Sequence, residues 1–312
     1  MRGLLVALFI SLCLIQISYS FKVVHPATID RTIHHPTWVE EKNNFFSKTH
    51  MKFKSGFKKN PNREEIPALA YSGDISSLPD TFDSRTEWSN CSTIGAIQNQ
   101  ARCGSCWAFG AVSSVSDRFC IHKQEDIQLS FQDLVTCDQS DNGCEGGDDV
   151  SAYNFIKKKG IVSAACSPYT IPTCPPAQQP CLNFVSTPKC VQKCQNDTID
   201  YASDKHHLSS IYSIPDVASM MKDLVANGPY EVCFDVYEDF LGYKSGVYQH
   251  TTGKFLGGHC VKLLGYGTEN NTPYWLLANQ WTTYWGDQGF FKILRGKNEC
   301  GIEAEAVGGI PL

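Results

Sequence analysis

The stretch that decides the fold is Gln100-Ala-Arg-Cys-Gly-Ser-Cys-Trp-Ala-Phe109. From Ser105 to about Cys120 the apolar residues recur at helical spacing, and Ser105 is a suitable cap, so we predict a helix that begins at Cys106. The dipole and free N–H groups at that end favour an anion, which suits a thiolate nucleophile. Cys103 and Cys106 have two alternative interpretations, a redox C-x-x-C pair or half of a zinc site. The first lacks a βαβ context, and the second lacks further ligands at a zinc-finger spacing.

Two later segments supply candidate partners for the thiol of Cys106. His259 follows Gly257-Gly258 at the start of a predicted strand, where the backbone can come close to a ligand. Asn279 can hold the imidazole ring through an amide hydrogen bond, and Trp281 can keep water off that bond. An imidazolium beside Cys106 would lower the thiol pKa, which a nucleophile working in acid requires.

Composition restricts the class of protein. The 312 residues are 42% hydrophobic and 19% charged, which excludes wholesale disorder. A net charge of −5 without a basic block argues against nucleic acid as a partner. After the N-terminus, no apolar run is long enough to span a membrane.

The N-terminus predicts processing. Residues 1–20 have the positive start, apolar run and small-residue cleavage site of a secretory signal peptide. We therefore expect the secretory pathway, with the lysosome or the extracellular space as destination, and disulfides for most of the fourteen cysteines after Cys13. Residues 21–77 hold no cysteine and carry nine Lys/Arg against six Asp/Glu, whereas residues 78–312 carry 17 against 26. A cationic leader before an acidic body predicts a detachable pro-segment that ends near Ser77; a tail without a role is the alternative.

The remaining pattern predicts an α+β fold of two packed lobes. The front half is helical, and residues 138–210 look like loop because Cys, Gly and Pro are frequent there. A short helix is expected at 216–226, and strands are expected at 231–236, 259–265, 274–279 and 290–295.

The motif at residues 103–107 resembles C-G-[SA]-C-[WY], which with a downstream His and Asn is typical of papain-like cysteine peptidases. The resemblance covers residues 78–311. It is greatest with the cathepsin B-like branch, through Asp117-Arg-Phe-Cys-Ile-His122, Tyr243-Lys-Ser-Gly-Val-Tyr-Gln-His250 and Cys300-Gly-Ile-Glu-Ala-Glu305.

The resemblance implies a helical left lobe, a β-barrel-like right lobe and an active site in the cleft between them. By position, Cys106 is the nucleophile, His259 the base and later the acid, and Asn279 the residue that orients it. Gln100 resembles the side-chain donor of the oxyanion hole. The resemblance further implies a zymogen and monomer without cofactor or metal, with protein or peptide substrates, its own pro-segment as inhibitor and cystatin-like inhibitors as candidate partners.

A substrate-binding surface is also implied. Gly146 and Gly147 match the strip along which an extended peptide lies, and Trp281 belongs to the same surface. Glu305 matches the acid at the base of the pocket for the second residue before the scissile bond. Asp148 and Asp149, which replace the family's Tyr-Pro, predict a stronger preference for basic side chains at that pocket. Cys233 and Cys260 stand where the family has small residues lining it, close enough either to bridge or to narrow it as free thiols.

By resemblance the disulfides are Cys91–Cys120, Cys103–Cys144, Cys137–Cys190, Cys166–Cys194 and Cys174–Cys181. The last pair encloses a loop that in cathepsin B carries two histidines for the substrate carboxylate, but residues 174–181 contain none. Its usual acidic anchors are Asn99 and Tyr284 here. We therefore expect an endopeptidase with weak or absent carboxydipeptidase activity. Asn196 is the best candidate for a glycan.

Two other functions stay open. One is a catalytically silent secreted binding protein on the same scaffold, although Cys106, His259 and Asn279 are all present. The other is a thiol–disulfide exchanger that uses Cys103 and Cys106, which a Cys103–Cys144 bridge would exclude.

Overall fold

The computed structural model describes residues 32–42, 46, 53–173 and 184–312, which lie in one compact unit. Its helices are α2 (Ser84–Glu87), α3 (Cys106–Lys123), α4 (Phe131–Cys137), α5 (Asp149–Lys159) and α6 (Val217–Asn227), with short 3₁₀ turns η1 (Gly143–Glu145), η2 (Glu238–Gly242) and η3 (Glu299–Gly301). Its strands are β1 (Thr32–His34), β2 (Trp38–Glu41), β3 (Phe82–Asp83), β4 (Leu208–Ser213), β5 (Tyr230–Tyr237), β6 (Tyr243–Tyr248), β7 (Phe255–Glu269), β8 (Thr272–Ala278), β9 (Phe290–Leu294) and β10 (Glu305–Pro311).

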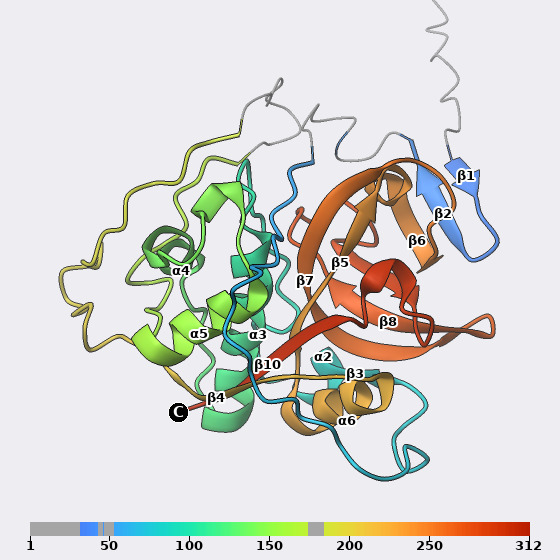
Figure 1. Cartoon of the computed structure of the whole chain (residues 1–312), viewed down its shortest axis with the longest axis horizontal. Helices are drawn as coiled ribbons and strands as arrows, with labels where there is room; N and C mark the ends of the chain where they lie inside the picture. Colours follow the sequence, from blue (N-terminus) through green and yellow to red (C-terminus); the bar gives the residue numbers. More distant parts are fainter. Residues whose placement is uncertain (1–31, 43–45, 47–52, 174–183) are drawn as a thin grey trace, which may run out of the picture. The chain divides into compact units, whose positions relative to one another are not determined.

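Helices and strands form two lobes with separate cores. Figure 1 shows α3, α4 and α5 together on one side and the curled sheet on the other. One core gathers aromatic side chains of the helical lobe, such as Trp107, Phe109 and Phe131. The other gathers aromatic side chains of the sheet, such as Trp275, Trp285 and Phe240. The α+β, two-lobe prediction is therefore confirmed.

The sheet runs in the order β1-β2-β6-β9-β8-β7-β5-β10-β4, with β3 paired to β7. Neighbouring strands are antiparallel except for β6 and β9. Within the residues that the structure describes the sheet stays open, so the predicted barrel-like lobe is a curled sheet rather than a closed barrel. No helix in this part of the chain has the length and apolar character that crossing a membrane requires.

Most predicted elements are present, and one region was misjudged. The helix expected at 216–226 is α6, which Asp216 caps by accepting a hydrogen bond from Ser219 N–H at 2.8 Å. The loop-like interpretation of residues 138–210 was wrong in part, because α5 and the start of β4 lie there. Three lysines end α5 and its sequence is polar on average, so the helix depends on packing and on its cap more than on an apolar stripe.

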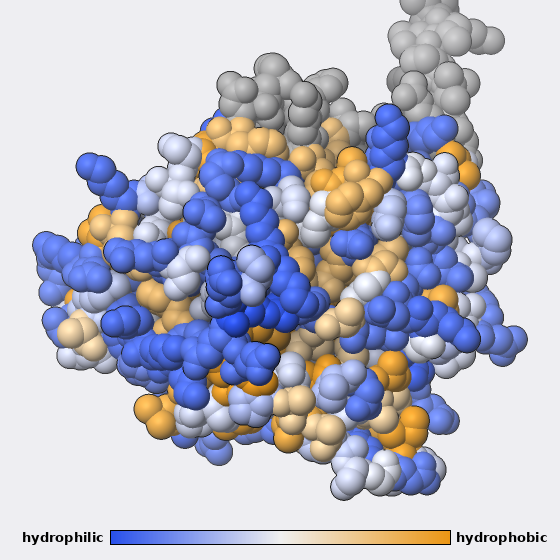
Figure 2. Space-filling model, viewed as in Figure 1, coloured by the Kyte–Doolittle hydropathy of each residue, from blue (hydrophilic) through white to orange (hydrophobic). Residues whose placement is uncertain are grey.

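The described part of residues 32–77, which we call the N-terminal segment, packs on both lobes. Trp38 of β2 is buried against the ring of Tyr248, and β2 extends the sheet by pairing with β6. Further on, the segment runs across the middle of the view in Figure 1, and Figure 2 shows a strip of hydrophilic side chains along this course. The segment is therefore part of the folded unit.

Candidate active site

Cys106 is the first residue of α3, and its side chain is fully buried. Burial raises the pKa of its thiol to about 12, and the negative charge of Glu231 adds to the increase. Backbone N–H groups of Cys260, Gly56 and Trp107 act in the opposite direction. The disulfide Cys103–Cys144 leaves Cys106 without a C-x-x-C partner, which excludes the exchanger that uses both cysteines.

His259 lies on β7 and is equally buried. Its Nε2 is 2.9 Å from Asn279 Oδ1, and the ring of Trp281 stacks on it with centroids 4.6 Å apart. Burial lowers the pKa of His259 to about 4, and the Asn279 hydrogen bond raises it only partly. Its Nδ1 has no hydrogen-bond partner among the described residues.

The arrangement differs from the expected thiolate–imidazolium pair. The raised pKa of Cys106 and the lowered pKa of His259 both favour neutral groups. Desolvation penalises each charged form, and neither group has a hydrogen bond to the other to compensate. In this state the thiol is therefore a weak nucleophile.

Two glutamines, Gln100 and Gln280, bond to the residues around Cys106 and His259. Gln100 Nε2 donates to Cys103 O at 2.8 Å, and Gln100 Oε1 accepts from Trp281 Nε1 at 3.2 Å. Gln280 donates from Nε2 to Cys260 O at 2.8 Å, and its backbone N–H donates to Asn279 Oδ1 at 2.9 Å. Sequence reasoning did not assign Gln280 a role, because its contacts join residues from different strands.

The N-terminal segment covers this site. Gly147 N–H donates to Gly56 O at 2.9 Å, Lys58 N–H donates to Gly147 O at 2.8 Å, and Phe57 N–H donates to Gly258 O at 3.3 Å. A Cβ atom on Gly56 would lie 2.5 Å from Cys106 Sγ, closer than real contacts allow. The segment backbone therefore passes directly beside the sulfur, a placement that no local sequence motif indicated.

Two basic side chains from the middle of this segment, Lys59 and Arg63, enter a cluster of acidic residues that we call the acidic pocket. Arg63 Nη1 lies 2.9 Å from Asp149 Oδ1 and 3.3 Å from Asp148 Oδ2, and Arg63 Nη2 lies 2.8 Å from Glu305 Oε2. Lys59 also pairs with Glu305. Burial, together with the charge of Asp148, raises the pKa of Asp149 to about 7.

Asp148 has a second, structural role as the cap of α5. Its Oδ1 accepts from Ser151 N–H at 3.0 Å, and its Oδ2 accepts from Asn60 N–H at 2.8 Å. Its backbone N–H donates to Asp141 Oδ1 at 2.9 Å. Sequence reasoning treated Asp148 as a rim charge only.

The sheet next to these carboxylates contains a buried disulfide between Cys233 and Cys260. Glu305 is the register partner of Cys233 across β10 and β5, and Cys233 is the register partner of Cys260 across β5 and β7. The three residues therefore lie in one cross-strand row, beside the carboxylate that binds Arg63. Of the two alternatives for this cysteine pair, the structure has the bridge.

Four of the five disulfides implied by resemblance are also present: Cys91–Cys120, Cys103–Cys144, Cys137–Cys190 and Cys166–Cys194. Cys174–Cys181 lies outside the described residues. Asn196 is exposed, and its Oδ1 accepts from Thr198 N–H at 3.0 Å, but its glycosylation stays a prediction.

Comparison with known proteins places this geometry in a family. Residues 78–310 match the model of the papain family cysteine proteases, and the chain belongs to this family. Within the family it is cathepsin B-like. It is 53% identical over 310 residues to a cathepsin B of Dictyostelium discoideum, covering 98% of this chain and 99% of that protein. It is 47% identical over 258 residues to a gut-specific cysteine proteinase of Caenorhabditis elegans, covering 79% and 78%.

A solved structure agrees with both fold and family. The procathepsin B S9 of Trypanosoma congolense superposes with a TM-score of 0.78 at 34% identity, covering 88% of this chain and 94% of that one. The protein is therefore a cysteine peptidase, a hydrolase of peptide bonds, whose fold and family agree with the sequence-based prediction.

Proposed function

We propose that the chain is the zymogen of a cysteine endopeptidase with weak or absent carboxydipeptidase activity. In this proposal residues 1–20 are a signal peptide, residues 21–77 an inhibitory pro-segment and residues 78–312 the peptidase. The main support for the zymogen proposal is the course of the N-terminal segment, because the backbone at Gly56 occupies the space beside Cys106. The destination is the lysosome or the extracellular space, where cystatin-like inhibitors would compete for the same cleft.

Departure of the segment would restore solvent to Cys106 and His259 and permit the ion pair that burial opposes. The thiolate would attack the scissile carbonyl carbon, and His259 would give its proton to the leaving amine, which leaves a thioester. Water, deprotonated by His259, would then hydrolyse the thioester and regenerate the thiolate. Asn279 would keep the imidazole in place throughout.

Gln100 and the Cys106 backbone N–H would form the oxyanion hole. An amide nitrogen has two N–H donors, and Gln100 uses one on Cys103 O, which leaves the second for the developing oxyanion. Trp281 fixes the amide from its other end, since its indole N–H donates to Gln100 Oε1.

The proposed endopeptidase preference rests on the residues that would otherwise bind the C-terminal carboxylate of a substrate or anchor the loop that binds it. Neither Asn99 nor Tyr284 has a carboxylate that could anchor a loop. The Oδ1 atom of Asn99 already accepts a hydrogen bond from Ala101 N–H at 2.8 Å, and the side chain of Tyr284 is 67% exposed. His206 and His207, the adjacent histidines later in the chain, contact Asp204 O and Lys157 O rather than residues of the site. Asp148, Asp149 and Glu305 would favour a basic residue at the second position before the scissile bond.

The test compares two peptides that differ only at the C-terminus, one with a free carboxylate and one amidated. Matured protein from the full chain should cleave both at comparable kcat/KM, and Cys106→Ala should abolish cleavage and labelling by a cysteine-directed epoxide. A strong preference for the free carboxylate would refute the endopeptidase assignment. Persisting cleavage in Cys106→Ala would refute the assigned nucleophile.

A further inference from the structure

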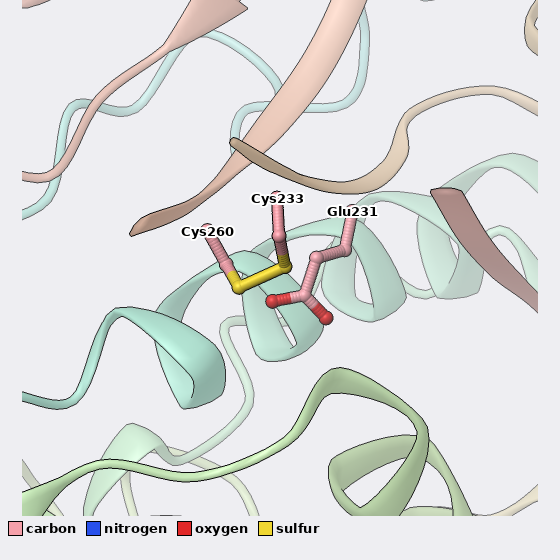
Figure 3. Close-up of side chains that lie close together, drawn as sticks. All are labelled: Glu231, Cys233 and Cys260. Carbon is pink, nitrogen blue, oxygen red and sulfur yellow. A yellow bond between two sulfur atoms is a disulfide. The ribbon is translucent and has the colours of Figure 1, made fainter. Parts of the chain in front are cut away.

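Beneath the acidic pocket, three buried side chains of two strands point at one another. Glu231 and Cys233 are two residues apart on β5 and therefore share a face of the sheet, and Cys260 lies opposite Cys233 on β7. One carboxylate oxygen of Glu231 and the two sulfur atoms all lie within 4.8 Å of one another. Figure 3 shows the carboxylate directed at the disulfide, with α3 behind it.

Glu231 has no partner that explains its burial. The residue is fully buried, and no side chain among the described residues gives its carboxylate a hydrogen bond. Burial raises the pKa of Glu231 far above its usual range, and the backbone N–H of Ala111 offsets this only in part. Lys262, its register partner on β7, gives its ammonium to Asp117 at 2.7 Å and to Thr93 O at 3.1 Å. An unsatisfied buried carboxyl is costly, so a cation at this point would remove a penalty.

We propose that reduction of the Cys233–Cys260 disulfide turns this trio into a binding site for a soft divalent metal such as Zn²⁺. Two thiolates and the Glu231 carboxylate would be the protein ligands, and water would fill the fourth position. Sulfur and carboxylate donors in this number are those that zinc takes in proteins. The site depends on the disulfide and on Glu231, and does not require that Cys106 be a nucleophile.

The chemistry requires a thiol reductant. A dithiol would give two electrons and two protons to the sulfur–sulfur bond, which breaks into two thiols while the dithiol closes into its own disulfide. Metal binding would then release the two thiol protons and any proton on Glu231. Zinc–sulfur bonds of about 2.3 Å place two thiolates roughly 3.8 Å apart in a tetrahedron, a separation that neighbouring strands can supply.

Position links the site to the peptidase. Cys260 directly follows His259, and Cys233 lies opposite Glu305, which binds Arg63 and Lys59 of the N-terminal segment. The segment therefore lies over the carboxylate next to the metal site. An ion held by the buried trio would lie beneath the pocket for the second substrate residue, and its positive charge would oppose the binding of a basic side chain there.

The test uses the full chain carrying Cys106→Ala, which removes the nucleophile as a competing ligand. After mild reduction with a phosphine and exclusion of air, Co²⁺ is added as a spectroscopic probe of thiolate ligands and Zn²⁺ is counted by elemental analysis. We expect one ion per chain more than in Cys106→Ala/Cys233→Ser, and at least about tenfold weaker binding in Cys106→Ala/Glu231→Gln. Unreduced protein should lack this ion.

Three further variants make the test specific. Cys300→Ser removes the other free thiol among the described residues and should leave binding unchanged. Cys260→Ser repeats the Cys233 test if that variant fails to fold, and Arg63→Ala should speed metal uptake without changing its stoichiometry. Equal metal in the reduced parent and the cysteine variants would overturn the proposal. So would a disulfide that alkylation mapping shows to open only when circular dichroism reports unfolding.

Discussion

Gly56 determines how closely the N-terminal segment approaches Cys106, the proposed nucleophile. Its missing side chain lets the backbone pass between Cys106 Sγ and Gly104 O, which an added Cβ would approach to 2.5 and 2.7 Å. Because the second of these neighbours is backbone, it has little freedom to move aside. A glycine is required here for contact and not for an unusual φ angle.

We therefore expect Gly56→Ala to weaken the binding of the segment to the two lobes and to expose Cys106. In the full chain, Cys106 should react faster with a cysteine-directed epoxide, by about tenfold for each 1.4 kcal/mol of lost contact. Labelling is followed by mass spectrometry. Ala70→Ser, at an exposed position of the same segment, is the control, and equal labelling in all three proteins would contradict the close approach seen here.

Gln280 lies next to His259, and we expect it to position the imidazole. Its amide N–H to Cys260 O ties the segment after β8 to the residue that follows the histidine. Loss of one neutral hydrogen bond costs about 0.5–1.5 kcal/mol, so Gln280→Ala should lower kcat roughly two- to tenfold with little change in KM. Steady-state kinetics of the matured enzyme measure kcat and KM. The matched control is Gln98→Ala, because the side chain of Gln98 bonds to Gln128 and not to a residue next to His259. A change in KM alone would argue against positioning.

Residues near a motif could be predicted from the sequence, and residues defined by distant contacts could not. Cys106 is marked by its helix start and Gln100 by its distance from Cys106, and the structure bonds Gln100 to Trp281, whose ring stacks on His259. Gly56 and Glu231 carry no such mark. Their importance arises only when segments far apart in sequence meet.

At the scale of elements, α5 shows how one residue serves both a helix and a pocket. Asp148 caps the helix through Oδ1 and faces Arg63 and Asn60 through Oδ2. Asn is as good a helix cap as Asp but carries no charge. The two roles can therefore be separated by substitution.

Asp148→Asn should keep the stability of the fold and reduce the preference for a basic residue in the pocket. Asp148→Ala should lose both, with a decrease of about 0.5–2 kcal/mol in the free energy of unfolding. Urea denaturation gives the free energy of unfolding. The ratio of kcat/KM for paired peptides with Arg or Leu at the second position before the scissile bond gives the preference for a basic residue. If Asp148→Asn unfolds as easily as Asp148→Ala, the cap is not what stabilises α5.

Elements with strong periodicity were predictable. Strands β5 and β7 contain the expected runs 231–236 and 259–265 and extend them by one to four residues at each end, because pairing continues beyond the apolar core of each strand. Strands β8 and β9 match the runs expected at 274–279 and 290–295 but end one residue earlier, at Ala278 and Leu294. The helix α5 was missed because disulfides and packing on α3 stabilise a region rich in loop residues. Strand β2 was missed because its partner, β6, lies about 200 residues away.

At the scale of the whole molecule, charge complementarity between the N-terminal segment and the acidic pocket would connect the proposed inhibition by the segment to pH. Arg63 lowers the pKa of Asp149, while burial raises it to about 7. The attraction between them exists only when Asp149 is ionised, so this part of the segment's binding is present above about pH 7 and declines as the pH falls through that value.

Arg63→Gln should therefore expose Cys106 most where Asp149 is charged. We expect the ratio of epoxide labelling rates, variant over parent, to be largest near about pH 8 and to narrow toward about pH 5, because the parent loses the same attraction on acidification. Taking the ratio at each pH cancels the reagent's own pH dependence. A ratio that stays constant across this range would show that Arg63 acts through shape and not through the charge of Asp149.

Lys54→Gln gives the matched control for this prediction. Lys54 is a second cation of the segment and lies 2.6 Å from Glu145 Oε1 on the helical lobe. Its hydrogen bond lowers the pKa of Glu145, so that carboxylate stays charged over the whole range. The Lys54→Gln ratio should then be flat with pH and close to one, because exposed ion pairs contribute about 0–1 kcal/mol. Of the two carboxylates compared here, only Asp149, which is buried and has a raised pKa, would make the binding of the segment depend on pH near neutrality.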